Sequence, residues 1–213
     1  MAPADASSRP YDTLIVDYGN VLVQWDPLGA VAGHITTEEW KEFSNNAPFH
    51  RYNSMMDAGV PFDHIIGTIL HEHPDHPNYA DIMRIYRDNH TSSLIGPVPG
   101  VTNLLVSLSD RGIRLVGLTN FDPTLFENAV SFAPILDVFD GVVVSGAEGL
   151  TKPDPRIYEL TLERYGIDRT RALFIDDSSA NVHGAQNVGL NAIQFTTAGQ
   201  LRAALHDLGV MSH

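Results

Sequence analysis

The stretch TLIVDYGNV, at residues 13–21, decides the fold of this chain. It opens with a short apolar run, which is typical of a strand buried on both faces of a parallel sheet. Asp17 follows the run at once, and Gly19 and Asn20 then favour a sharp turn. In open α/β sheets, ligands bind at the carboxyl ends of the strands. We therefore predict that Asp17 is a functional carboxylate.

Strand and helix patterns alternate after the segment GPVPG at residues 96–100. The expected strands cover residues 113–118, 141–144, 172–175 and 192–195. The expected helices cover residues 101–108, 123–130, 155–165, 180–188 and 198–208. This alternation predicts an α/β fold, with a doubly wound, Rossmann-like parallel sheet that the strand at residues 13–16 must join.

The block that follows the first strand has a different pattern. Residues from about 27 to 92 show no convincing strand and read as several short amphipathic helices. The predicted division is a flexible tail at 1–10, a core at 11–23 and 97–213, and an all-helical cap at 24–96. Because the cap leaves and rejoins the core beside Asp17, it is placed to act as a lid.

Composition narrows the classes of function. The 213 residues are 43% hydrophobic, enough for one packed core with an insertion. No apolar stretch approaches the roughly 20 residues that span a bilayer, and residues 1–10 lack the apolar segment of a secretory signal. The sequence has no cysteine, and its formal net charge of -13 should repel nucleic acid and anionic membranes. We expect a cytoplasmic protein with a small-molecule partner and neither nucleic-acid nor membrane partners; its oligomeric state stays open.

Polar side chains follow four of the predicted strands, and parallel strands bring their carboxyl ends to one edge of the sheet. They are Asp17, the pair Thr119 and Asn120, Lys152 after a loop at 145–151, and the pair Asp176 and Asp177. One carboxylate can attack phosphorus to form an aspartyl-phosphate. Mg²⁺ would relieve the repulsion within such a carboxylate cluster. A hydroxyl, backbone amides and a lysine ammonium can hold the phosphoryl oxygens.

Four segments resemble the signature motifs of the haloacid dehalogenase superfamily, in the order that this family requires. They are VDYGNV at 16–21, LTN at 118–120, KPDPRIY at 152–158 and FIDDSSANVHGA at 174–185. The resemblance covers roughly residues 12–208, and the block between the first two motifs resembles the family's helical cap. It implies a Mg²⁺-dependent hydrolase of a small phosphorylated metabolite.

The resemblance also implies a role for each matched residue. The metal ligands would be Asp17, the carbonyl of Gly19, Asp177 directly, and Asp176 either directly or through water. The catalytic pair would be Asp17 as nucleophile and Lys152 as the bridge between phosphate and nucleophile. The phosphate would be held by Thr119, Asn120 and Lys152.

Gly19 departs from the pattern of most phosphatases that the chain resembles. They carry a second Asp two residues after the nucleophile, which protonates the leaving group and then activates water. Such general acid–base help is worth ~10²–10⁴-fold in rate. The run at residues 17–21 resembles a subgroup that includes glucose-1-phosphate phosphatases and keeps this glycine. We therefore predict a sugar phosphatase, which uses an easily departing group or borrows an acid from the cap or substrate.

Three alternatives stay open. A metal-independent 2-haloacid dehalogenase fits residues 152–158, but those enzymes resemble Ser-Ser at positions 176 and 177 and usually place a Tyr at position 19. A phosphonate-cleaving relative also lacks the second Asp but needs a cap lysine, and Lys41 reads as part of a solvated helix face. A non-catalytic protein could bind a phosphorylated ligand, although binding alone needs no nucleophile.

The predicted cap is rich in histidine, a residue whose pKa suits the missing acid. The residues are His34, His50, His64, His71, His73, His76 and His90. The run HEHPDH at residues 71–76 superficially resembles a transition-metal site, but its prolines and polar neighbours favour an exposed loop. The sequence singles out none of these histidines. Tyr18 and Trp25, near the nucleophile, either shape the pocket or pack.

Overall fold

The computed structural model describes residues 9–211 and contains a five-stranded parallel sheet in the order β5-β4-β1-β6-β7. The strands are β1 (Thr13–Val16), β4 (Arg114–Thr119), β5 (Gly141–Val144), β6 (Ala172–Asp176) and β7 (Asn191–Gln194). β1 lies at the centre and pairs in parallel with both β4 and β6. The predicted α/β fold class is therefore confirmed. The predicted tail at 1–10 lies outside the described residues, apart from Arg9 and Pro10.

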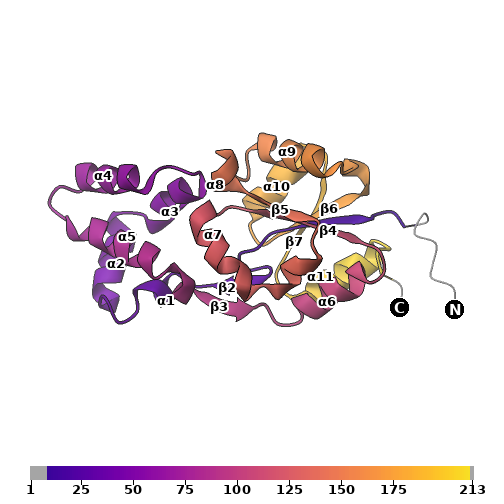
Figure 1. Ribbon diagram of the computed structural model, residues 1–213, viewed down its shortest axis with the longest axis horizontal. Coiled ribbons are helices and arrows are strands. Elements are labelled where there is room, and N and C mark those ends of the chain that lie inside the picture. The colour runs from indigo at the N-terminus through magenta and orange to yellow at the C-terminus, as the bar shows by residue number, and fades with distance from the viewer. Residues whose placement is uncertain (1–8, 212–213) are drawn as a thin grey trace.

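Helices cover both faces of the sheet, with α9 and α10 on one face and α6 and α11 on the other (Figure 1). The core helices are α6 (Val101–Ser109), α7 (Pro123–Ala129), α8 (Ser145–Glu148), α9 (Pro155–Tyr165), α10 (Ser179–Asn187) and α11 (Ala198–Asp207). Short 3₁₀ turns follow at Val130–Phe132, Pro134–Val138 and Arg169–Arg171. The segment expected to be a loop at 145–151 instead begins as the helix α8, which is too short to leave a periodic pattern.

The alternation of side chains along β1 explains the two layers. Successive strand residues point to opposite faces of a sheet. Leu14 and Val16 belong to the apolar cluster that includes α6 and α11, whereas Ile15 belongs to the cluster that includes α9. All residues of β1 are buried, so this strand is held by packing on both faces. Asp17, the next residue, is thereby fixed at the edge of the sheet.

The insertion between β1 and β4 folds into a helical cap, at the left of Figure 1. Its helices are α1 (Leu28–Val31), α2 (Thr37–Asn46), α3 (Phe49–Asp57), α4 (Phe62–Glu72) and α5 (Asn78–Asp88), followed by a 3₁₀ turn at His90–Ser93. At its two ends the structure differs from the all-helical expectation. Strands β2 (Val23–Trp25) and β3 (Leu94–Pro97) pair there as an antiparallel ribbon. Their partners are distant in sequence, so no local pattern reveals the pairing.

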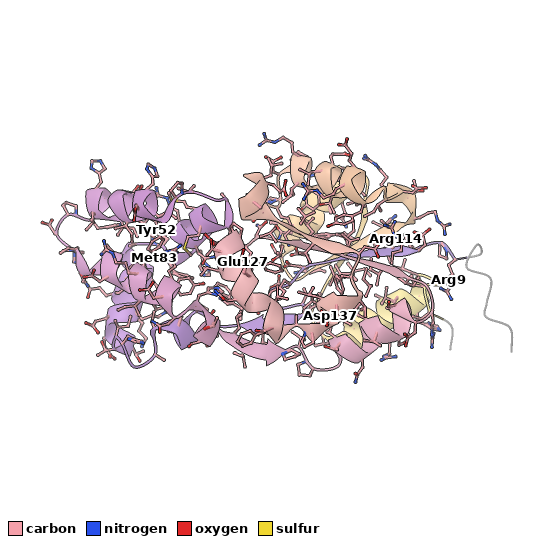
Figure 2. The ribbon with its side chains drawn as sticks, in the orientation of Figure 1. Arg9, Tyr52, Met83, Arg114, Glu127 and Asp137 are labelled. Atoms are coloured by element: carbon pink, nitrogen blue, oxygen red, sulfur yellow. The ribbon has the colours of Figure 1, made fainter. Side chains whose placement is uncertain are left out.

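The cap buries apolar side chains of its own. Figure 2 shows Tyr52 and Met83 within the cap, at the opposite end of the molecule from Arg114; both side chains are fully buried. They belong to the same apolar cluster as Leu14 and Val16 of the sheet. The cap and one face of the core are thus joined by continuous apolar packing.

Over residues 9–211, no helix combines the length and the apolar character that a membrane crossing requires.

Candidate active site

The carboxyl ends of three neighbouring strands form one end of the site. Asp17 follows β1, Thr119 ends β4 and Asp176 ends β6. The backbone N–H of Asp17 donates to the carbonyl of Ile175, 2.9 Å away, which extends the pairing of β1 with β6 by one residue. The structure therefore brings these predicted site residues together at the central strand, as the strand-end rule for open sheets requires.

Lys152 lies between two of these carboxylates. Its Nζ is 2.8 Å from Asp17 Oδ1 and 2.7 Å from Asp176 Oδ2, and it donates to the carbonyl of Leu118 at 2.9 Å. Burial lowers the pKa of Lys152, but the carboxylates of Asp17 and Asp176 outweigh burial and raise that pKa overall. All three ammonium hydrogens have partners, so the side chain is a fixed positive charge.

Asn120 holds this lysine in place through its backbone. The side-chain Oδ1 of Asn120 accepts from the backbone N–H of Lys152 at 2.8 Å, and Nδ2 donates to the Lys152 carbonyl at 2.9 Å. Both polar groups of the amide are therefore engaged with Lys152. The sequence assigned Asn120 to the phosphate, whereas its side chain is used here to position the lysine.

Asp17 has one engaged oxygen and one free oxygen. Oδ1 accepts from the backbone N–H of Tyr18 at 2.7 Å and pairs with Lys152. Within the described part of the chain, no hydrogen bond reaches Oδ2, which leaves it available to react. Burial raises the pKa of Asp17 to about 7; Lys152 opposes that rise and the Asp176 carboxylate adds to it.

Three carboxylates offer oxygen ligands to a metal ion. Asp17, Asp176 and Asp177 each contribute an oxygen, and these atoms lie within 4.8 Å of one another. Hard oxygen ligands with room for water suit Mg²⁺. Both oxygens of Asp176 already accept hydrogen bonds from Asn181 Nδ2 at 3.0 and 3.2 Å. Asp177 receives a single side-chain bond, from Asn20 Nδ2 at 3.3 Å, so the donor set fits Asp177 as the more open ligand.

A cavity of about 130 Å³ lies between core and cap, and Asp17 and Lys152 are among the core residues that line it. This volume is well below the ~300–1,000 Å³ of sites for drug-sized ligands, so the cavity suits a small metabolite. Gly19 and Thr119 line it, and the Thr119 hydroxyl has no hydrogen-bond partner among residues 9–211. The apolar part of the lining is Trp25, Met56, Tyr86, Leu94, Phe121 and Leu125. Tyr18 also lines it, but its hydroxyl donates to the Ala129 carbonyl at 2.6 Å and serves packing.

Sequence reasoning gave no role to four polar residues of the cavity wall, namely Asn53, Asp57, His90 and Asn181. Asn181 could have been found, because it lies inside the quoted motif at 174–185. Asn53 and Asp57 belong to α3 and follow no strand, so the strand-end rule could not find them. Asp57 is nevertheless the one carboxyl that the cap contributes to the cavity lining.

The cap histidines differ sharply from one another. His90 is 6% exposed and lines the cavity, and its Nδ1 has no hydrogen-bond partner in the described part of the chain. Burial lowers the pKa of His90 to about 4, so its ring is neutral at pH 7. In the described ranges, the only group of three potential metal ligands is the aspartate cluster, and the run at residues 71–76 forms no such group. Lys41 is exposed on α2 and does not line the cavity.

Known proteins resemble this chain in sequence. Residues 34–195, more than half of the chain, match the family described as haloacid dehalogenase-like hydrolase. Glyceraldehyde 3-phosphate phosphatase from Pyrococcus abyssi is 28% identical over 156 residues, which cover 73% of this chain and 60% of that enzyme. The chain thus spans less than two thirds of that relative. Sesquiterpene phosphatase astK from Aspergillus oryzae is 26% identical over 201 residues, covering 87% of this chain and 90% of its own.

Similarity extends to a dehalogenase and to solved structures. An (S)-2-haloacid dehalogenase from Pseudomonas sp. strain YL is 30% identical over 107 residues, which cover 50% of this chain and 46% of that enzyme. A haloacid dehalogenase family enzyme from Bacteroides thetaiotaomicron, in complex with magnesium and inorganic phosphate, superposes with a TM-score of 0.63 at 20% identity, covering 88% of this chain and 95% of that chain. At this identity the likeness concerns the fold alone. Because both phosphatases and a dehalogenase match, the site must decide between the two reactions.

Proposed function

Because this chain belongs to the haloacid dehalogenase-like hydrolase family, we propose that it is a magnesium-dependent phosphatase of a small phosphate monoester. The proposal rests above all on Lys152, whose Nζ lies 2.8 Å from Asp17 Oδ1 and 2.7 Å from Asp176 Oδ2 beside a third carboxylate. A nucleophile, a fixed cation and hard metal ligands are thereby combined at one point. Attack on a phosphate ester is the reaction that uses all of them.

In the proposed mechanism, each residue acts from the position described above. Lys152 holds Asp17 Oδ1, so that the free Oδ2 attacks phosphorus, breaks the bond to the leaving oxygen and forms an aspartyl-phosphate. The Thr119 hydroxyl donates to a phosphoryl oxygen, and Asn120 keeps Lys152 beside the developing charge. Mg²⁺ bound by Asp17, the Gly19 carbonyl, Asp177 and Asp176, the last directly or through water, would neutralise the anions that must meet. Water then attacks phosphorus and releases Asp17.

The electrostatics of the cavity favour this reaction over dehalogenation. A 2-haloacid carries a carboxylate, which Asp176 and Asp177 would repel in the absence of a metal ion. Among the described residues that line the cavity, Lys152 is the only Lys or Arg, and it is already paired with two carboxylates. The described lining therefore offers no unpaired Lys or Arg to bind a second anionic group. The substrate is therefore a monophosphate whose remaining part is uncharged.

A sugar phosphate fits this description. Its neutral hydroxyl groups would meet Asn53 and His90, and its carbon faces would meet aromatic residues such as Trp25 and Tyr86. Glyceraldehyde 3-phosphate, named for the Pyrococcus relative, is of the same chemical class. A reducing, cytoplasmic location suits the cysteine-free sequence and is part of the proposal.

The test measures the release of phosphate and of chloride. With Mg²⁺, the purified protein should release phosphate from p-nitrophenyl phosphate and from members of a panel of sugar phosphates, and EDTA should abolish that release. Metal-independent chloride release from 2-chloropropionate would instead assign a dehalogenase. Turnover in neither assay, together with binding of a phosphorylated metabolite, would assign a non-catalytic protein.

A further inference from the structure

Among the described core residues beside Asp17, none is placed to protonate a leaving alkoxide, and the Tyr18 hydroxyl already donates to the Ala129 carbonyl. Gly19 has no side chain, Lys152 is held by two carboxylates, and Asp176 accepts bonds from Lys152 and Asn181. The remaining carboxyl of the cavity lining comes from the cap. We propose that Asp57 is the general acid, and then the general base, of the reaction. This inference rests on the proposed phosphatase function.

Asp57 is the last residue of α3, and it lines the same cavity as Asp17, Thr119 and Lys152. Its Oδ2 accepts from Asn53 Nδ2 at 2.9 Å, which fixes the side-chain rotamer. Within residues 9–211, its Oδ1 makes no hydrogen bond. One oxygen is therefore anchored by α3, while the other is free to exchange a proton with a molecule in the cavity.

The surroundings of Asp57 favour the protonated form of its carboxyl. Burial raises the pKa of Asp57 well above its usual range, and the carboxylates of Asp122 and Asp17 raise it further; Lys152 and Asn53 oppose this. Tyr86 of α5 also faces it and is neutral at pH 7. The C-terminal end of α3 adds a negative dipole end, which disfavours a carboxylate. A carboxyl with a raised pKa can act as a general acid near neutral pH.

Direct docking of the cap on the core holds Asp57 in place. The buried Ser145 hydroxyl, at the start of α8, donates to the backbone carbonyl of Asp57. The Ser145 Oγ in turn accepts from the backbone N–H of Phe121 at 2.9 Å. Gly59 adopts a left-handed φ of +77°, and a Cβ atom added there would collide with the carbonyl of Gly146. The backbones of the two segments thus touch, so Asp57 is positioned by the core as well as by α3.

The other titratable groups near the cavity suit the role less well. His90 has a pKa lowered to about 4 by burial, so it carries no ionisable proton to donate at pH 7. Asp122 is the N-cap of α7, and its Oδ1 accepts from the backbone N–H groups of Thr124 and Leu125. Neither group combines a held proton with a free oxygen in the cavity, as Asp57 does.

Asp57 gives up a proton in the first step and takes one back in the second. As Asp17 Oδ2 bonds to phosphorus and the leaving oxygen departs, the Asp57 proton moves to that oxygen and a neutral alcohol is released. Asp57, now a carboxylate, then takes a proton from water while the water oxygen attacks phosphorus. The bond between Asp17 and phosphorus breaks, inorganic phosphate forms, and the enzyme returns with Asp17 ionised and Asp57 protonated.

The test compares two leaving groups in wild type, Asp57→Asn and the control His90→Gln, all with Mg²⁺. For β-glycerol phosphate, whose alkoxide needs a proton, kcat/KM of Asp57→Asn should fall by ~10²–10⁴-fold. For p-nitrophenyl phosphate, whose anion departs unaided, kcat/KM should fall by less than about tenfold, and a burst of nitrophenolate should appear because the second step is slow. His90→Gln should affect both substrates alike. Activity toward the aryl ester also shows that each variant is folded.

The contrary outcomes are distinct. Equal losses of kcat/KM on both esters, or no loss on the alkyl ester, would overturn the role of Asp57 while leaving the phosphatase intact. A leaving-group-selective loss in His90→Gln instead would assign the acid to His90. A wild type that hydrolyses neither ester with Mg²⁺ would overturn the phosphatase and this inference together.

A rescue variant separates a lost proton donor from a distorted cap. A Cβ atom at Gly19 meets nothing within 4 Å, so a side chain can start there, two residues after the nucleophile, without a clash at its Cβ. The double variant Asp57→Asn with Gly19→Asp should recover at least ~10-fold of kcat/KM on β-glycerol phosphate, part of the range for one acid–base group. A double variant that stays as slow as Asp57→Asn would mean that cap geometry, not the proton, was lost, and would overturn the assignment.

Discussion

The two walls of the cavity are built in different ways. On the core side, Asp17, Thr119 and Asp176 stand at the ends of adjacent parallel strands, and the order of the strands alone brings them together. On the cap side, Asp57 stands at the end of a helix and reaches the cavity through docking of that helix on α8. In our proposal, the core wall supplies the groups that make and break bonds, and the cap wall supplies the proton. Substitutions in the two walls should therefore impair catalysis in different ways.

The largest effect should come from Asp17→Asn, because it removes the proposed nucleophile of the core wall. We expect phosphate release to fall by ~10⁴-fold or more, in line with the loss of other catalytic nucleophiles, for aryl and alkyl esters alike. The matched control is Asp140→Asn, an exposed core aspartate paired with Arg114. Near-wild-type kcat with Asp17→Asn would disprove covalent catalysis at this residue.

Lys152→Met tests whether the core wall is also held together by its charge pairs. It leaves the carboxylates of Asp17 and Asp176 buried without a cation, which costs ~3–5 kcal/mol for a broken buried pair. Chemical denaturation should show this loss. The control is Lys41→Met, which changes the chain's other lysine at an exposed position and should stay within about 0.5 kcal/mol. Equal stabilities of the two variants would show that Lys152 contributes no net stability.

Gly59→Ala tests the docking of the cap wall. A left-handed φ costs a non-glycine residue ~1–2 kcal/mol, and the added methyl would also press on Gly146. The control is Gly33→Ala, which has φ +80° and open space, so it carries the conformational cost alone. Both variants should lose stability in thermal unfolding, but only Gly59→Ala should lose kcat/KM selectively on alkyl phosphates. Identical kinetics of the two would show that docking does not position Asp57.

The smallest effect is a change in the pH dependence of stability. Because the pKa of Asp57 is raised in the folded state, that state binds more protons than the unfolded state between the usual pKa of an Asp and the raised pKa of Asp57. Stability is therefore full below the unfolded pKa and falls as pH rises toward the folded pKa. Asp57→Asn removes this penalty, so its melting temperature relative to wild type should rise from pH 4 to pH 8. A constant difference across this range would place the folded pKa near the unfolded one.

The same contrast explains what could be predicted from the sequence. The residues of the core wall could be predicted because an apolar run followed by a polar residue, such as residues 13–16 followed by Asp17, is a local signal. The family that the motifs resemble is confirmed by the match over residues 34–195. The ribbon of β2 and β3 was missed because its strands pair across the whole cap. Asp57 was missed because its position depends on Ser145 and Gly146, almost ninety residues later in the chain.

The most direct test traps the covalent intermediate at the junction of the two walls. Asp57→Asn is mixed with Mg²⁺ and p-nitrophenyl phosphate, quenched in acid, digested and analysed by mass spectrometry. We predict one added phosphoryl group on the peptide that contains Asp17, accumulating because the cap wall no longer supplies the base for its hydrolysis. Turnover with an unmodified Asp17 peptide, or with the phosphoryl group on another residue, would contradict the account.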